Sequence, residues 1–171
     1  MPVLCSMVLS LATGCASSGS FTMNQPVSVK LSHFKSATVA VKSGLNGAPE
    51  RLDEYMEQLE SRIVVKLREQ ALFGKIYSHA ETDSHADLGI TVTITKIRDI
   101  NDYDRVMWGA LAGQATTHAK VDITDLATGK LIGSGEIVGK SSDNGTVFSG
   151  TTPQAVDRVA DAVVDLVKSN L

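Results

Sequence analysis

Hydrophobic residues recur at helical spacing in two segments of the chain. They lie three or four positions apart, as expected for the buried face of an α-helix. The first set comprises Leu52, Tyr55, Met56, Leu59, Ile63, Leu67 and Ala71, and the second Val156, Val159, Ala160, Val163 and Val167. Pro49 suits a first helical position and Gly74 a left-handed terminus. The pattern predicts helices over about 49–73 and 153–168.

Apolar and polar residues alternate in the segments between and before these helices, which is typical of half-buried β-strands. The clearest case is 88–98, where Leu88, Ile90 and Val92 are interleaved with threonines. Further strands are predicted from Val27 to Leu31 and over 37–41, 75–79, 115–124 and 131–139, with a turn over 125–130. This order predicts an α+β fold: a mainly antiparallel sheet of about five to six strands with both helices packed on one face.

A short apolar run over 3–12 is followed by small residues and Cys15. About ten residues are too few to cross a bilayer but match the apolar core of a signal peptide. The run resembles the lipobox of bacterial lipoproteins, which implies cleavage between Gly14 and Cys15 and a lipid such as palmitate on the Cys15 thiol. No Lys or Arg precedes the run, since the first charged residue is Lys30. An uncleaved N-terminal tail and a Cys5–Cys15 disulfide are the alternatives.

The domain organisation follows from this interpretation. Residues 1–14 would be a signal peptide, the uncharged and polar residues 15–27 a flexible tether, and 28–171 a single α+β domain. Cleavage would remove Cys5 and leave no disulfide framework, so an apolar core must hold the fold.

Composition argues against nucleic-acid and nucleotide binding. The net charge is −3 and aromatic residues make up 5% of the chain, so a basic or base-stacking surface is not expected. The segment from Gly135 to Ser141 resembles a phosphate-binding loop, but its first glycine is one residue too close and the residues between read as strand. We expect neither a nucleotide nor another cofactor.

Several polar residues have the chemistry of catalytic or metal-binding groups. Asp83, His85 and Asp87, with Glu81 nearby, have the donor chemistry of a divalent-metal site, but short polar loops often hold such residues, and we expect a solvated loop. Serines lack the Gly-x-Ser-x-Gly setting of a nucleophile. The histidines of strand-like segments are scattered: His33, His79 and His118. The chain is therefore expected to be non-enzymatic and metal-free.

Two further features are candidates for partner contact. Trp108 precedes a glycine-rich segment with small residues at Gly109 and Gly113, which predicts a turn or, alternatively, a partner-facing loop. Asp157, Asp161 and Asp165 share one face of the last predicted helix. That face is expected to point to solvent, with a docking face for a basic partner as the alternative.

The C-terminal part of the chain, over about 37–171, resembles a family of small bacterial lipoproteins known only as a domain of unknown function. The resemblance rests on Leu72-Phe73-Gly74-Lys75-Ile76, Ala86-Asp87-Leu88, the glycines at 109–113, and Val121 to Asp125 with Thr128-Gly129-Lys130. It implies a periplasmic α+β domain and no catalytic residues. Ala16, after the lipidated position, is similar to lipoproteins sorted to the outer membrane.

These features predict an outer-membrane lipoprotein whose periplasmic domain binds another envelope protein without catalysis, through an edge strand or the glycine-rich loop. An accessory hydrolase or small-molecule-binding enzyme is the first alternative. A subunit of a secretion or pore assembly, forming a homo-oligomeric ring, is the second.

Overall fold

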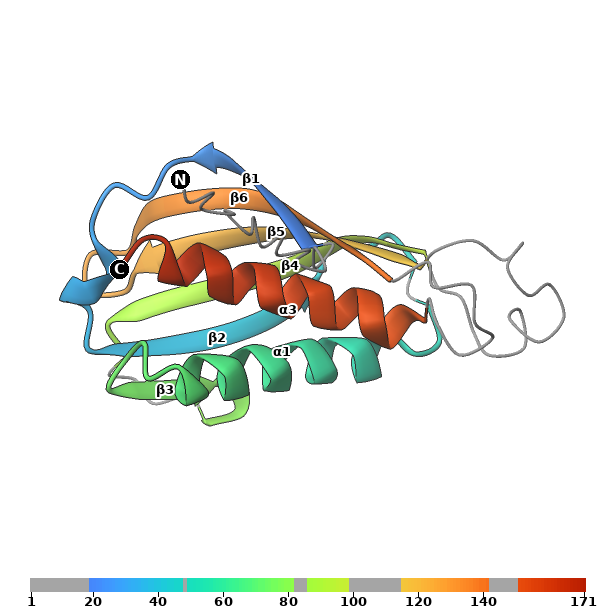
Figure 1. Cartoon of the computed structure of the whole chain (residues 1–171), viewed down its shortest axis with the longest axis horizontal. Helices are drawn as coiled ribbons and strands as arrows, with labels where there is room; N and C mark the ends of the chain where they lie inside the picture. The colour runs from blue at the N-terminus through green and yellow to red at the C-terminus, as the bar shows by residue number, and fades with distance from the viewer. Residues whose placement is uncertain (1–18, 48, 82–85, 99–114, 142–150) are drawn as a thin grey trace, which may run out of the picture.

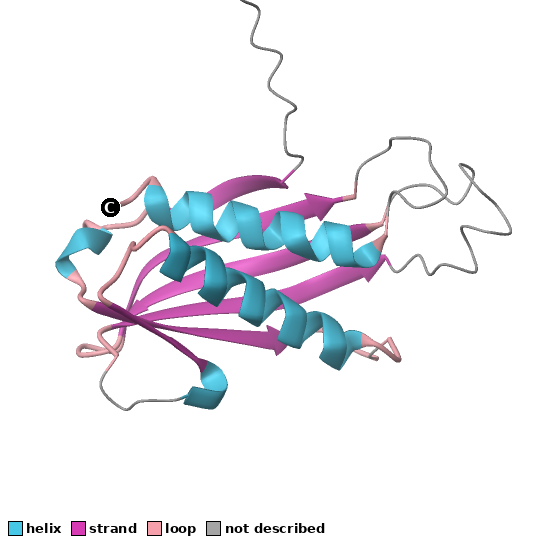
Figure 2. Ribbon diagram, turned by 60° about the horizontal axis from the view of Figure 1, so that its bottom comes forward, coloured by secondary structure: helices cyan, strands magenta, loops and turns pink. Residues whose placement is uncertain are grey.

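A computed structural model describes residues 19–47, 49–81, 86–98, 115–141 and 151–171. Its strands are β1 (Gly19–Gln25), β2 (Ser36–Ser43), β3 (Lys75–Ser78), β4 (Leu88–Arg98), β5 (Thr116–Asp125) and β6 (Lys130–Lys140). Its helices are α1 (Leu52–Glu69) and α3 (Thr152–Lys168), with the short 3-10 turns η1 (Leu31–His33) and η2 (His79–Glu81). Both long helices lie side by side over one face of a six-stranded sheet (Figure 1 and Figure 2). The predicted α+β class is confirmed.

The sheet is mixed, with strand order β1-β6-β5-β4-β2-β3. Neighbouring strands pair antiparallel along β1, β6, β5 and β4, whereas β2 runs parallel to both of its neighbours, β4 and β3. Parallel pairing of β2 with β3 requires a crossover, and α1 provides it by carrying the chain back along the sheet. β1 and β3 are therefore the two edge strands (Figure 1).

The core lies between the sheet and the helices. Alternate side chains of the central strands point toward the helices, and Val92, Ile94 and Val121 are fully buried there. Leu59 and Ile63 of α1 are likewise fully buried and belong to the same core cluster. Each side chain of this size stabilises the fold by roughly 1.5–3 kcal/mol when removed from water, so the predicted stripes supply the main driving force.

The N-terminal boundary of the domain differs from the prediction. Residues 19–25, expected within the flexible tether, form β1 and pair with β6. The strand expected from Val27 to Leu31 is wrong: Ser28 donates one backbone hydrogen bond to the Ile132 carbonyl oxygen (2.8 Å), and the chain then enters η1. The alternation there arises because Val27 packs against the core and Leu31 is buried in it, without a continuous ladder.

The ends of the first helix also differ from the prediction. α1 begins at Leu52, so Pro49 lies before the helix, and it ends at Glu69. The left-handed residue is Ala71 (φ 49°), not Gly74. The Leu72 N–H donates to the Leu67 carbonyl oxygen and the Ala71 N–H to that of Arg68, which is the hydrogen-bond pattern of a Schellman terminus.

Glycines let α3 approach the sheet closely. A Cβ at Gly139 of β6 would collide with the Ala155 carbonyl oxygen of α3. A Cβ at Gly19 of β1 would lie 2.6 Å from the Arg158 carbonyl oxygen. Gly19 and Gly139 are paired across β1 and β6, so the N-terminal half of α3 packs directly on the backbone of these two glycines.

Candidate functional site

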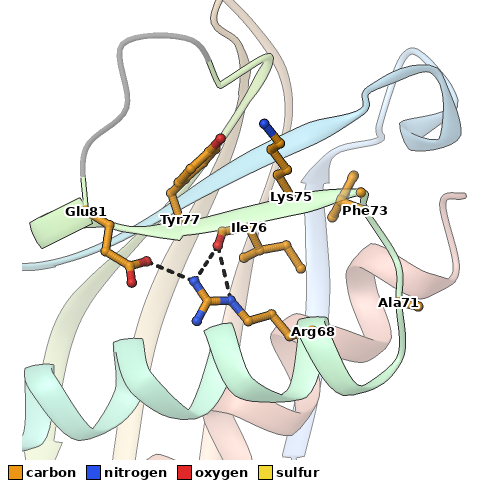
Figure 3. A pocket seen from close by; sticks show the side chains of 8 residues that line it. Arg68, Ala71, Phe73, Lys75, Ile76, Tyr77 and Glu81 are labelled. Atoms are coloured by element: carbon orange, nitrogen blue, oxygen red, sulfur yellow. Dashed lines mark hydrogen bonds and ion pairs between the residues drawn. The ribbon is translucent and has the colours of Figure 1, made fainter.

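The two sheet edges differ in how their backbone groups are used. At the β3 edge, the Arg68 guanidinium donates to the Ile76 carbonyl oxygen and pairs with Glu81 (2.9 Å; Figure 3). The Glu81 carboxylate also accepts the Ser78 N–H (3.1 Å). The Ser78 N–H and the Arg68 side chain lower the pKa of Glu81 below its ordinary value. Protein groups therefore occupy backbone groups of β3 that a partner strand could otherwise use.

An open groove of about 840 Å³ runs along the β3 edge. It is lined by Arg68, Ala71, Phe73, Gly74, Lys75, Ile76, Tyr77 and Glu81 (Figure 3). A second groove of about 590 Å³ shares Arg68 and Glu81 with it and continues along α1, where Val65 is 44% exposed. Because Arg68 and Glu81 already bind each other, the grooves offer a mixed surface rather than a charged binding site.

The β1 edge has no comparable protection among the described residues. β1 pairs with β6 on one side, and five of its seven residues are exposed. The strand carries no charged side chain, and Phe21 is 42% exposed. Soluble proteins usually protect an edge strand with charges, prolines or a covering segment. An uncharged and exposed edge is therefore the described surface best suited to pair with a strand of another chain.

The sequence predicts partner binding through an edge strand but does not indicate which strand. β1 was assigned to the tether because its residues are small and polar. The signal available was the spacing of two between Phe21 and Met23, which share the helix-facing side of the strand with Ile137 and Gly135.

Five predicted site residues lie outside the described residues. These are Gly14, Cys15, Trp108, Gly109 and Gly113. Their predicted roles in cleavage, lipidation and partner contact stay predictions. The described part of the chain begins at Gly19, four positions after Cys15.

The candidate metal-binding set is not assembled by the described residues. Asp83 and His85 lie outside them, and Asp87 serves a structural role at the start of β4. Its carboxylate accepts hydrogen bonds from the Ser36 hydroxyl (3.0 Å) and from the backbone N–H of Lys35 (3.1 Å), which lower its pKa. Over the described ranges, no three His, Cys, Asp or Glu side chains are grouped as metal ligands would be.

The three histidines of the predicted strands lie on three different elements. His33 ends η1, His79 begins η2 and His118 lies within β5. Of these, His79 lines the groove beside α1, where its backbone N–H donates to Glu60 (2.8 Å). The described structure thus gives no support to a shared histidine site.

The aspartate face of α3 is only partly directed to solvent. Asp161 pairs with Lys66 of α1 (2.8 Å), and Asp157 pairs with Arg62 (3.3 Å). Asp165 is exposed, as predicted. The prediction of a solvent-facing row therefore holds only in part: Asp157 and Asp161 are partly exposed, and α1, which packs beside α3, supplies their basic partners from the same chain.

The segment that resembled a phosphate-binding loop forms strand and strand end. Gly135 and Gly139 belong to β6, and the Ser141 hydroxyl accepts a hydrogen bond from the Ala115 N–H (3.0 Å). A phosphate-binding loop needs its glycines between a strand and a helix N-terminus, which this segment does not provide. Within the described part of the chain, no helix has the length and apolar character to cross a membrane.

Comparisons with solved structures relate the fold to known proteins. A PelC dodecamer from Paraburkholderia phytofirmans aligns with 86% of this chain and 96% of its own, at 13% identity and a TM-score of 0.56. The lipoprotein GNA1162 from Neisseria meningitidis aligns with 78% of this chain and 98% of its own, at 15% identity and a TM-score of 0.42. At these identities the first comparison shows a shared fold, and the second carries no further argument.

Comparisons of sequence give the family. No curated protein matches the chain at a significant level. One family profile, described as a domain of unknown function (DUF4410), matches residues 31–151, which span most of the chain from η1 to the start of α3. The resemblance to a lipoprotein family of unknown function is thereby confirmed at the level of the domain. The chain belongs to the DUF4410 family.

Proposed function

We propose that this protein is a lipid-anchored component of the cell envelope and acts as a non-catalytic assembly module. Its α+β domain binds another envelope protein by accepting a strand at the β1 edge. The observation that carries the proposal is the contrast between the two edges. Arg68 and Glu81 occupy backbone groups of β3, whereas β1 is uncharged and mostly exposed.

The anchor part of the proposal rests on the sequence around Cys15. The apolar run and the small residues before Cys15 fit a lipoprotein signal. Ala16 favours the outer membrane, where the domain would lie on the periplasmic face.

The anchor is tested by expressing the full chain in a bacterium that processes lipoproteins and measuring the mass of the mature N-terminus. We expect a chain that begins at an acylated Cys15 and sediments with membranes, and a Cys15→Ser variant that is neither cleaved there nor acylated. An unmodified wild-type chain would overturn the anchor.

The binding edge is tested with two matched substitutions of exposed apolar residues. Phe21→Lys puts a charge on the β1 edge, and Val65→Lys puts the same charge in the groove beside α1; both positions are more than two-fifths exposed. With a photocrosslinking residue at Thr22, we expect adducts with one envelope protein that Phe21→Lys removes and Val65→Lys retains. Loss with Val65→Lys alone would place the binding site in the groove and contradict the proposal.

A second candidate is a subunit of a ring-forming homo-oligomer. It is favoured by the shared fold with PelC, which is described as a dodecamer. In that case the strand pairing with β1 comes from a second copy, and native mass spectrometry of the detergent-solubilised protein gives a defined oligomer. A monomer that still crosslinks from Thr22 to another protein would exclude this candidate.

A further inference from the structure

The start of β1 fixes how far the folded domain can lie from a lipid on Cys15. Three residues lie between Cys15 and Gly19, and the four Cα–Cα steps of a fully extended chain between them span at most about 14 Å. A tether of about a dozen residues, as the sequence alone suggested, could extend to roughly 40 Å. The shorter connection changes which parts of the domain can reach the membrane.

Gly19 is part of the folded body rather than the end of a loose arm. Its position beneath α3 leaves no room for a side chain, because a Cβ would lie 2.6 Å from the Arg158 carbonyl oxygen and 3.3 Å from the Ala162 Cβ. It is also the first residue of the ladder with β6, opposite Gly139. Gly19 is therefore held rigidly to the sheet and to α3, so the location of Gly19 determines the location of the sheet.

The ladder places Gly19 at one end of the sheet. The row that starts at Gly19 continues through Gly139 and Thr117 to Ile97, near the end of β4. Asp125 and Lys130 pair at the opposite end of β5 and β6. β5 has ten residues, which at about 3.3 Å per residue separates the two ends by roughly 30 Å.

We infer that the end of the sheet containing Gly19 faces the membrane surface. This inference rests on the proposed lipid anchor at Cys15. The distance between the sheet ends, roughly 30 Å, is about twice the greatest reach of the connection, so the Lys130 end cannot be the part held at the membrane while Gly19 points away. The ends of β4 and β6 and the first turn of α3 face the lipid headgroups. The C-terminus and the turn between β5 and β6 project away (Figure 1).

The orientation also sets where β1 is offered to a partner. β1 starts at the membrane end and spans seven residues, roughly 20 Å, away from it. Its partner strand must therefore lie within about 35 Å of the lipid surface, a distance that a component held at the same membrane can reach.

The test uses the full, processed and lipidated protein in vesicles of phosphatidylethanolamine and phosphatidylglycerol with a quencher on the headgroups. Two matched variants, Arg98→Cys and Lys130→Cys, each replace an exposed cation at one end of the sheet and carry the same fluorophore. Cys5 leaves with the signal peptide and the Cys15 thiol is alkylated, so each mature variant has one reactive thiol. We expect several-fold stronger quenching at position 98 than at position 130.

A lengthened connection is the control for geometry. Insertion of about a dozen Gly and Ser residues after Ala16 restores a long tether, and the difference between the two labels should largely disappear. A second pair, Lys96→Cys and Thr128→Cys, repeats the measurement if either first variant is misfolded by circular dichroism.

The possible failures are distinguishable. A mature chain without lipid, shown by its mass, overturns the proposed function and the orientation together. A lipidated chain with equal quenching at both ends, or stronger quenching at position 130, overturns the orientation alone and indicates a domain that lies on its side or is inverted.

Discussion

Ser36 and Asp87 hold each other in place across the parallel pair of β2 and β4. The Ser36 hydroxyl donates to the Asp87 carboxylate (3.0 Å), and the Asp87 N–H donates to the Ser36 hydroxyl (3.1 Å). The backbone N–H groups of Lys35 and Ser36 donate to the same carboxylate oxygen (3.1 and 3.2 Å). Asp87, a candidate metal ligand in the sequence, instead aligns the start of β4 with the start of β2. Ser36 and Asp87 are 51 positions apart in the chain.

This arrangement makes stability depend on acid pH. The Ser36 hydroxyl and the Lys35 N–H stabilise the carboxylate, so the folded pKa of Asp87 lies below its ordinary value of 3.8. A lowered folded pKa gives stability that is fully present above pH 3.8 and is lost as pH falls through the folded value. We expect Asp87→Asn to lower the free energy of unfolding at neutral pH. Denaturant titrations should show that this difference from the wild type shrinks as the pH falls below 3.8. The exposed Asp165→Asn is the control, and an unchanged deficit in acid would contradict the assignment.

Gly139→Ala should be strongly destabilising. The added Cβ collides with the Ala155 carbonyl oxygen, a backbone atom, so α3 or β6 must shift. Overpacking of this kind typically costs about 1–3 kcal/mol, and we expect the upper part of that range because helix and strand must separate. Urea unfolding measures the loss. Val138→Ala, at the neighbouring and partly exposed position of β6, should cost less than about 1 kcal/mol; equal effects would show that the close approach of α3 is not responsible.

Ala71→Gly should stabilise the protein. Ala71 has φ 49°, a left-handed conformation that disfavours a side chain, and it is exposed, so the methyl group contributes little packing. Removing the steric penalty at a Schellman terminus should raise the unfolding free energy by about 0.5–1 kcal/mol. Gln70→Gly, one position earlier with right-handed backbone, should instead destabilise. Stabilisation by both substitutions would point to a cause other than backbone strain.

Arg68→Ala should open the β3 edge. The substitution removes the donors to the Ile76 carbonyl oxygen and the partner of Glu81. Because Arg68 is about half exposed, the stability loss should stay below about 1 kcal/mol, while self-association measured by light scattering should rise. Arg68→Lys keeps the charge but lacks the forked guanidinium, so it should protect the edge only in part. Unchanged association in both variants would show that Arg68 does not guard this edge.

The sequence predicted elements well where one face is continuously buried. β4 runs from Leu88 to Arg98 as expected, because its apolar residues alternate from Leu88 to Ile94 and are buried there; the register shifts after Ile94, and Ile97 is only partly buried. The helix stripes containing Ile63 and Val163 are likewise buried. β1 was missed because an edge strand with one covered face needs little hydrophobicity, and its hydrogen bonds come from β6, more than a hundred residues later.

The candidate site shows the same division. The anchor at Cys15 could be predicted from the sequence because a lipoprotein signal is a local, linear pattern, and it stays a prediction. The difference between the β1 and β3 edges could not, since it depends on Arg68 of α1 reaching Ile76 and on η2 placing Glu81 beside both.

The sequence by itself determined the α+β class, the two helices and most of the strands, because burial of alternating or helical stripes is a local requirement on residue type. The tertiary structure alone decided the strand order, the parallel placement of β2, the ion pairs between α1 and α3, and which sheet edge is closed. These depend on which segments meet in space, and hydrogen bonds and close packing are formed between residues whose separation in the sequence carries no local signal.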